Sequence, residues 1–142
     1  MITAIDTNVL LDVFGADAKF GEASARALRR CLAEGAIVAC EVVWVEAAAA
    51  FSSAAAFEEA MKTLGVGYSS VNELTVRAAA RAWRGYRARG GKRERVVADF
   101  LVGAHAMEQS DRLLSRDRGF YRECFKGLQL LDPGAGLAST GR

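Results

Sequence analysis

Residues 2–8 of the chain read ITAIDTN, a short apolar stretch followed directly by an acidic, a hydroxyl and an amide side chain. The residues Ile2–Ile5 predict a buried strand, and Asp6 and Asn8 are typical of the turn that ends a strand. Binding sites of open α/β sheets lie just beyond the carboxyl ends of strands. Asp6 is therefore the first candidate for a functional residue.

Short strand-like segments and longer helical segments alternate along the rest of the chain. The expected strands are residues 2–5, 36–40, 66–71, 112–115 and 128–131, and the expected helices are residues 9–14, 20–32, 42–51, 54–64, 73–87, 96–109 and 120–125. Such alternation is typical of parallel sheets. We therefore predict an α/β fold with a central parallel β-sheet of four to five strands flanked by helices.

The composition is that of one ordinary globular domain, with 142 residues, of which 51% are hydrophobic and 25% charged. We place the domain at residues 1–133 and expect a flexible C-terminal tail at residues 134–142. No apolar run is long enough to span a membrane, and the three cysteines suit neither a disulfide framework nor a zinc site. We therefore expect a soluble, cytoplasmic protein that does not bind membranes.

Positive charge is concentrated in residues 77–95, which carry eight Lys or Arg residues and one acid, Glu94. In contrast, residues 1–76 carry five Lys or Arg residues and ten Asp or Glu residues. A dense basic segment can neutralise several phosphates, and phosphate contacts supply most non-specific affinity for nucleic acids. The alternative is a solvated helix face followed by a loop.

Four acids occupy positions suited to one site. Asp6 follows the first strand, Asp117 follows the strand at residues 112–115, and Glu46 and Asp99 lie on helices that can lean over the same edge of the sheet. Clustered carboxylates need a cation, and hard oxygen ligands select Mg²⁺ or Mn²⁺. Such an ion activates water and stabilises charge on a phosphodiester, which is nuclease chemistry.

Each aspartate also has a structural alternative as a helix cap or a charge in a first helical turn. Glu46 differs, because it lies in the apolar run at residues 42–51, where we expect burial. An unpaired carboxylate there would cost several kcal/mol, so a metal ligand explains Glu46 better than a surface position. Glu41 is the competing acid, although its position suits the N-terminus of a helix.

Four segments in order resemble a PIN domain, in particular the VapC-type ribonuclease toxins of bacterial toxin–antitoxin pairs. They are residues 5–11 (IDTNVLL), Glu46, residues 99–106 (DFLVGAHA) and residues 113–121 (LLSRDRGFY). The resemblance implies a PIN-like three-layer fold and an endoribonuclease that hydrolyses RNA with Mg²⁺ or Mn²⁺. It also implies a cognate antitoxin as partner and a homodimer.

The resemblance also assigns roles to individual residues. The catalytic acidic quartet is Asp6, Glu46, Asp99 and Asp117, with the three aspartates closest to the metal. Asn8 and Ser115 are supporting polar residues that orient a carboxylate, a water or the substrate phosphate, and turn formation is their alternative role.

Several arginines are candidates for contact with RNA. Arg116 and Arg118 flank Asp117, and each has a salt bridge to a neighbouring acid as its alternative. Further candidates in the basic segment are Arg87, Arg89, Lys92 and Arg93. We expect a packing or hydrogen-bonding role for His105, since carboxylate and metal chemistry requires no histidine base.

Other functions compete with the toxin interpretation. A phosphatase that uses Asp6 as a nucleophile would have a second aspartate at position 8, where this chain has Asn8. A housekeeping PIN-type RNA-processing nuclease and a catalytically silent PIN module that binds RNA or protein are the remaining alternatives. For the homodimer, the apolar helices around Trp44 and Phe57 are candidates, although we favour core packing for Trp44.

Overall fold

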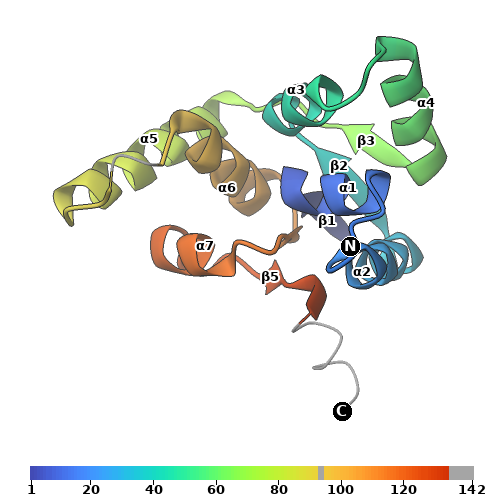
Figure 1. The fold of residues 1–142 in the computed structure, drawn as a ribbon. Coiled ribbons are helices and arrows are strands. Elements are labelled where there is room, and N and C mark those ends of the chain that lie inside the picture. The colour runs from blue at the N-terminus through green and yellow to red at the C-terminus, as the bar shows by residue number, and fades with distance from the viewer. Residues whose placement is uncertain (93–94, 135–142) are drawn as a thin grey trace.

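The computed structural model of the chain describes residues 1–92 and 95–134. Its centre is a sheet of five parallel strands in the order β3-β2-β1-β4-β5 (Figure 1). The strands are β1 (Ile2–Ile5), β2 (Ala36–Ala39), β3 (Val66–Tyr68), β4 (Arg112–Leu114) and β5 (Leu130–Leu131). This sheet confirms the predicted α/β class and strand number.

Seven helices connect these strands in the described part of the chain. They are α1 (Thr7–Phe14), α2 (Gly21–Glu34), α3 (Glu41–Ala49), α4 (Ala54–Leu64), α5 (Glu73–Ala88), α6 (Val97–Gln109) and α7 (Arg118–Cys124). From β1 the chain runs through β2 to β3, with α1–α4 in the connections, and it then crosses back to β4 and β5 with α5–α7 in the connections. Because such crossovers are right-handed, connections that run in opposite directions lie on opposite faces of the sheet. Figure 1 shows α5, α6 and α7 grouped away from α1–α4.

The edge strands are shorter than predicted. β3 ends at Tyr68, opposite Ala39, because β2 ends there and offers no further backbone partner. β5 has only two residues rather than the four expected at 128–131. The predicted tail falls beyond the described residues except for Gly134.

An aromatic cluster fills the space between α5, α6 and α7. Phe100 stacks on Trp83 with ring centroids 5.6 Å apart and contacts the edge of Phe120 at 5.2 Å. Gly103, one turn after Asp99, lies against Phe125, and a Cβ at this glycine would lie 2.3 Å from Phe125 Cε2. The close approach of α6 to the end of α7 therefore requires glycine at this position.

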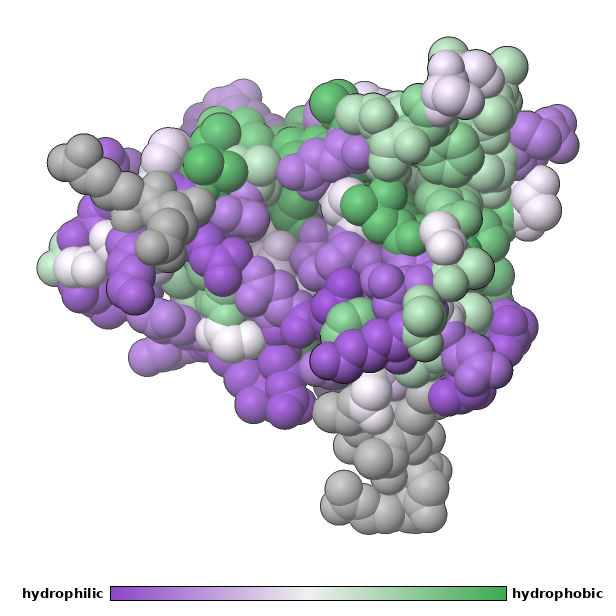
Figure 2. Space-filling view, viewed as in Figure 1, coloured by the Kyte–Doolittle hydropathy of each residue, from purple (hydrophilic) through white to green (hydrophobic). Residues whose placement is uncertain are grey.

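The surface has distinct polar and apolar regions. Figure 2 shows hydrophilic residues across the middle of one face and hydrophobic residues gathered over α3 and α4. Phe57 of α4 is buried, and Trp44 of α3 packs against its edge at 5.4 Å, so both aromatics contribute to the core. Within the described ranges, no helix is both long and apolar enough for a membrane span.

Candidate active site

The candidate site lies where the direction of the chain reverses in the sheet. β1 and β4 are adjacent at the centre, and the chain continues from β1 toward β2 but from β4 toward β5. Open α/β sheets form a crevice at such a switch point. Asp6 directly follows β1, and Asp117 lies three residues after the end of β4.

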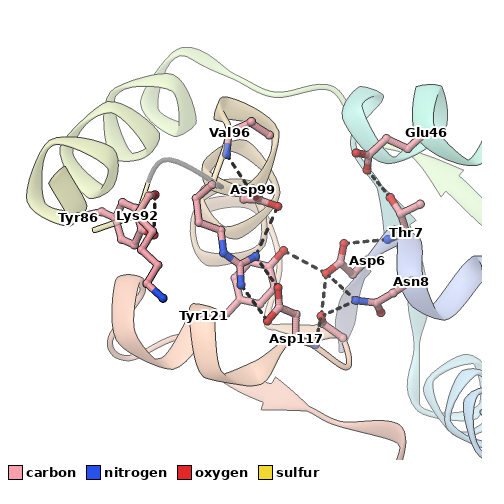
Figure 3. Close-up of polar contacts among 12 residues, drawn as sticks. Asp6, Thr7, Asn8, Glu46, Tyr86, Lys92, Val96, Asp99, Asp117 and Tyr121 are labelled. Atoms are coloured by element: carbon pink, nitrogen blue, oxygen red, sulfur yellow. Dashed lines mark hydrogen bonds and ion pairs between the residues drawn. The ribbon is translucent and has the colours of Figure 1, made fainter. Parts of the chain in front are cut away.

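Asp6 is held in one orientation by four donors (Figure 3). Its Oδ1 accepts a hydrogen bond from Thr7 N at 2.8 Å, which caps α1. Its Oδ2 accepts from Ser115 Oγ at 2.7 Å, Tyr121 OH at 3.0 Å and Asn8 Nδ2 at 3.4 Å. Burial raises the pKa of Asp6 despite these bonds, and Asp117 contributes to the rise. A nearby cation would therefore favour the ionised form.

Tyr121 is a further polar residue of the site, and it contacts Asp6. Its hydroxyl is buried and donates to Asp6. Burial raises the pKa of this phenol well above 10, and the negative charge of Asp6 contributes to the rise. The negative charges of Asp99 and Asp117 contribute further to this rise in pKa. Tyr121 was not among the residues predicted to form the site, although it lies one turn after Asp117 on α7.

Arg95 provides the positive charge between two of these acids. Its guanidinium donates to both Asp117 oxygens, with Nη1 to Oδ2 at 2.7 Å and Nη2 to Oδ1 at 3.4 Å. The same Nη1 lies 3.9 Å from Asp99 Oδ1, and the guanidinium stacks 4.3 Å from the centre of the Phe120 ring. The hydrogen bond to Asp117 is the main cause that raises the pKa of Arg95. Arg95 was expected only as part of the basic segment.

The second oxygen of Asp99 caps the N-terminus of α6, the helix on which Asp99 lies. Asp99 Oδ2 accepts from Val96 N at 3.2 Å, at the start of α6. This first-turn contact is the structural role considered for Asp99 in the sequence. The other oxygen, Oδ1, lies 3.9 Å from Arg95 Nη1. Asp99 therefore stabilises its helix and contributes to the acidic cluster at the same time.

The expectation that Glu46 lies among buried neighbours is wrong. Glu46 is exposed, and Val45 beside it is 68% exposed. The helix α3 fully buries only Val43 and Ala47. Its residues Val42, Trp44 and Ala48 are half-buried against the core, whereas Val45 and Ala49 are exposed together with Glu46. Glu46 Oε1 accepts from Thr7 Oγ1 at 2.6 Å, which connects it to the residue after Asp6.

Glu41, the competing acid, forms a separate structural group. It begins α3 and accepts hydrogen bonds from Ser70 Oγ and Val71 N, both at 2.9 Å. His105 Nε2 lies 2.9 Å from Ser69 Oγ, and burial lowers the pKa of this histidine although Glu41 opposes the shift. His105 therefore has the packing and hydrogen-bonding role expected from the sequence.

Asn8 and Ser115 combine the two roles that the sequence left open. Ser115 Oγ donates to Asp6 Oδ2 and accepts from Asp117 N at 3.0 Å, so it orients one carboxylate and holds the turn that carries the other. Asn8 Nδ2 reaches Asp6, and its Oδ1 accepts from Arg116 N at 3.2 Å. These two side chains therefore hold the ends of β1 and β4 together.

Arg116 and Arg118 form ion pairs in this structure. Arg116 donates twice to the buried Asp12, at 2.7 and 3.0 Å, and stacks over the Phe20 ring at 3.9 Å. Arg118 Nε lies 3.5 Å from Asp132 Oδ2. The salt-bridge alternative is therefore observed for both arginines, and it is structurally tighter for Arg116.

The basic residues at the end of α5 lie at the surface. Arg87, Arg89 and Lys92 are exposed, and Arg87 lies over the Trp83 ring at 5.3 Å from its centre. Arg93, the fourth candidate in this segment, falls outside the described residues.

The chemistry of the donor set fits a hard divalent cation. Asp6, Asp99 and Asp117 supply carboxylate oxygens, the ligands that Mg²⁺ and Mn²⁺ prefer. Among residues 1–92 and 95–134, no three His, Cys, Asp or Glu side chains lie close enough together to hold a metal. The Arg95 guanidinium, between Asp99 and Asp117, stands where a cation is needed. Ion binding at these acids would therefore require Arg95 to move.

Several solved structures share this fold. They include VapBC2 from Rickettsia felis bound to a DNA fragment from its promoter, with a TM-score of 0.72 and 14% identity over 93% of this chain and 98% of that one. FitAcB from Neisseria gonorrhoeae has a TM-score of 0.68 and 18% identity over 94% and 99% of the two chains. VapC20 from Mycobacterium tuberculosis, a sarcin-ricin loop cleaving toxin, has a TM-score of 0.57 and 17% identity over 89% and 98%.

Sequence comparison identifies the family. No curated protein sequence matches the chain significantly. The family model described as the PIN domain matches residues 3–126, which include Asp6, Glu46, Asp99 and Asp117. Because this match spans most of the chain, the protein belongs to the PIN domain family.

Proposed function

We propose that this protein is a Mg²⁺- or Mn²⁺-dependent endoribonuclease and the toxin of a toxin–antitoxin pair. The observation that carries the proposal is a chain of contacts among three acids at the switch point of the sheet. Ser115 Oγ bonds both Asp6 Oδ2 and Asp117 N, and the Arg95 guanidinium lies between Asp117 and Asp99. Neighbouring carboxylates repel one another, and here the Arg95 guanidinium supplies the positive charge that a metal ion would supply in its place. Nuclease activity is also what membership of the PIN domain family suggests.

Asp6, Asp99 and Asp117 would hold the cation. A bound Mg²⁺ or Mn²⁺ supplies activation of water and stabilisation of negative charge on the phosphodiester. The chain itself fixes the orientation of Asp6 through Ser115 and Tyr121, so this carboxylate needs little reorganisation when it binds the ion.

Residues at the rim would position the reactants. Glu46 is exposed and bonded to the Thr7 hydroxyl, a position from which its carboxylate can orient a water at the open side of the site. Arg95, once released from Asp117, can bind a non-bridging oxygen of the RNA phosphate, which guanidinium groups recognise well. The exposed residues Arg87, Arg89 and Lys92 would bind the flanking strand.

The toxin assignment rests on similarity to toxin–antitoxin proteins across almost the full length of the chain. The antitoxin would place a segment into the acidic cleft, where a basic side chain would meet the same carboxylates that now bind Arg95. The resemblance also supports a homodimer in the cytoplasm. We infer no RNA target, since selection among RNAs depends on loops and RNA shape.

Cleavage of total RNA by the purified protein tests the nuclease. We expect cleavage with Mg²⁺ or Mn²⁺, none with EDTA, and none by Asp99→Asn, which removes a ligand charge at nearly constant shape. Asp111→Asn is the matched control, because Asp111 is an exposed aspartate that binds Ile2 N and should leave cleavage unchanged. Equal cleavage by Asp99→Asn and the control would contradict the proposed site.

Expression without a partner tests the toxin. The wild-type chain should arrest growth of a bacterial host, and Asp99→Asn should not. If the wild-type protein cleaves RNA in vitro but leaves growth normal at the same expression level, a housekeeping nuclease becomes the better interpretation. If the folded protein binds RNA without cleaving it, a catalytically silent binding module becomes the better interpretation.

A further inference from the structure

A cleft of about 290 Å³ lies next to the acidic site, between α5 and the segment that leads into α6. Its lining residues are Trp83, Tyr86, Arg87, Gly91, Lys92 and Arg95. Figure 3 shows Tyr86 and Lys92 on the α5 side of the Asp99 and Asp117 carboxylates. Arg95 belongs to both places, because its guanidinium binds Asp117 while its side chain lines the cleft.

The rim of this cleft is anchored to α5. The buried Tyr86 donates its hydroxyl to Lys92 O at 2.9 Å. Gly91 packs directly on the same ring, since a Cβ there would lie 2.4 Å from Tyr86 Cε2. These contacts hold the backbone of Gly91 and Lys92 against the helix, so the cleft is a built feature of the fold.

The lining combines positive charge with an aromatic ring. Among the residues that the structure describes, the lining contains three cations, Arg87, Lys92 and Arg95, and no acid. Arg87 lies over the Trp83 ring at 5.3 Å, and the ring is supported by Phe100. If the Arg87 guanidinium moved onto a phosphate, the ring would be uncovered for a base. Cations for the backbone and aromatic rings for bases are the usual elements of single-strand binding sites.

We propose that this cleft binds one nucleotide of single-stranded RNA next to the phosphodiester held at the Asp6, Asp99 and Asp117 site. Arg87 and Lys92 bind the phosphate of that nucleotide, and its base lies against Trp83. The volume is close to the lower end of small-ligand sites, about 300 Å³, which suits one nucleotide rather than a duplex. The inference rests on the proposed ribonuclease function and specifies how its substrate is held.

The two tryptophans of the chain give an internal control. Trp44 lies on α3, with its indole N–H bonded to Ala39 O at 2.9 Å, whereas Trp83 lines the cleft. We would titrate ¹⁵N-labelled protein with a short oligouridylate in EDTA, which prevents cleavage, after assigning the indole signals with Trp44→Phe. The Trp83 indole signal should shift during the titration, and the Trp44 signal should not.

A charge-matched pair of variants tests the phosphate contacts. Arg87→Gln with Lys92→Gln should weaken oligouridylate binding at least tenfold at low salt. The same change should reduce the slope of log K against log salt by about 0.7, the contribution of one single-strand phosphate, because both cations bind the same phosphate. Arg26→Gln with Arg29→Gln is the control, because both residues are exposed on α2. The control should change binding less than twofold. All four positions are exposed, and the backbone NMR spectrum verifies folding.

These experiments test the nucleotide site independently of the proposed ribonuclease activity. Equal losses in the two double variants, or binding that leaves the Trp83 signal in place, would overturn the nucleotide site. Neither result bears on metal-dependent cleavage, which the Asp99→Asn comparison decides. Conversely, binding of oligouridylate through Trp83, Arg87 and Lys92 without any cleavage of RNA would support the nucleotide site and contradict the proposed ribonuclease activity.

Discussion

Replacing Arg95 with glutamine should increase the affinity of the protein for Mn²⁺. In the structure, the Arg95 guanidinium binds both oxygens of Asp117 and lies 3.9 Å from Asp99 Oδ1. A divalent cation needs the same oxygens, so each binding event must first break this ion pair. Glutamine preserves much of the side-chain length but removes the charge that competes with the metal.

The size of the effect follows from the exposure of the pair. The side chains of Arg95 and Asp117 are 31% and 35% exposed, which places them between a surface pair and a buried one. Surface pairs contribute about 0.2–1 kcal/mol, and the short two-point contact places this one near the upper end. A cost of about 1 kcal/mol corresponds to roughly a fivefold change in the dissociation constant.

Isothermal titration calorimetry with Mn²⁺ measures this change directly and does not depend on catalysis. Arg118→Gln is the control, because Arg118 also neighbours Asp117 in sequence but pairs with Asp132. It therefore corrects for the general loss of one positive charge near the site. We expect Arg95→Gln to bind Mn²⁺ most tightly. Arg118→Gln and the wild type should bind it more weakly and with similar affinities.

Two results would refute this reasoning. Equal affinities for the Arg95 and Arg118 variants would mean that only the overall charge matters. Weaker binding by Arg95→Gln than by wild type would mean that Arg95 orients Asp117 for the metal instead of competing with it.

Three further predictions concern the residues around the site. Arg116→Gln should lower the free energy of unfolding by about 2–3 kcal/mol in urea titrations, because it leaves Asp12 buried without its cation; a loss below about 1 kcal/mol would contradict this. Tyr121→Phe removes a hydrogen bond to Asp6 and should weaken Mn²⁺ binding about tenfold, so unchanged calorimetry would exclude a positioning role. Burial lowers the pKa of His105 below its usual 6.5, so the unfolded chain binds more protons than the folded protein as the pH falls through that value, and the free energy of unfolding decreases. His105→Asn should make this decrease smaller between about pH 7.5 and 5.5. An equal decrease in the wild type and the variant would contradict the prediction.

The sequence predicted the sheet well because its strands are strongly apolar and bounded by turn residues. β1 has the predicted bounds, Ile2–Ile5. The carboxyl ends of β1 and β4 bring Asp6 and Asp117 close together, since Ser115 Oγ bonds both Asp6 Oδ2 and Asp117 N. The outer strands were less predictable, because their length depends on how far a neighbouring strand continues. β3 ends at the residue that pairs with the last residue of β2. The sequence of residues 66–71 alone therefore does not show where β3 ends.

The partners of the acids were harder to predict than the acids themselves. Arg95 and Asp117 are 22 residues apart in the chain, and the Tyr121 hydroxyl reaches Asp6 across 115 residues. No local spacing encodes such contacts. The burial of Glu46 was mispredicted for a related reason, since α3 is apolar on all sides and its sequence does not indicate which side packs. A helix of that composition exposes Val45 at little cost.

Gly103 has a consequence that reaches beyond packing. It carries no functional group, yet the absence of its side chain lets the ring of Phe125 lie against α6. Asp99 lies one turn earlier on α6, and Asp117 lies immediately before α7, so this contact sets how near the two carboxylates can come. A single methyl group at position 103 would collide with the Phe125 ring, push the two helices apart and move the Asp99 and Asp117 carboxylates away from each other. A genetic screen for inactive protein should therefore find substitutions at this glycine as well as at the acids, although Gly103 supplies no side chain to the site.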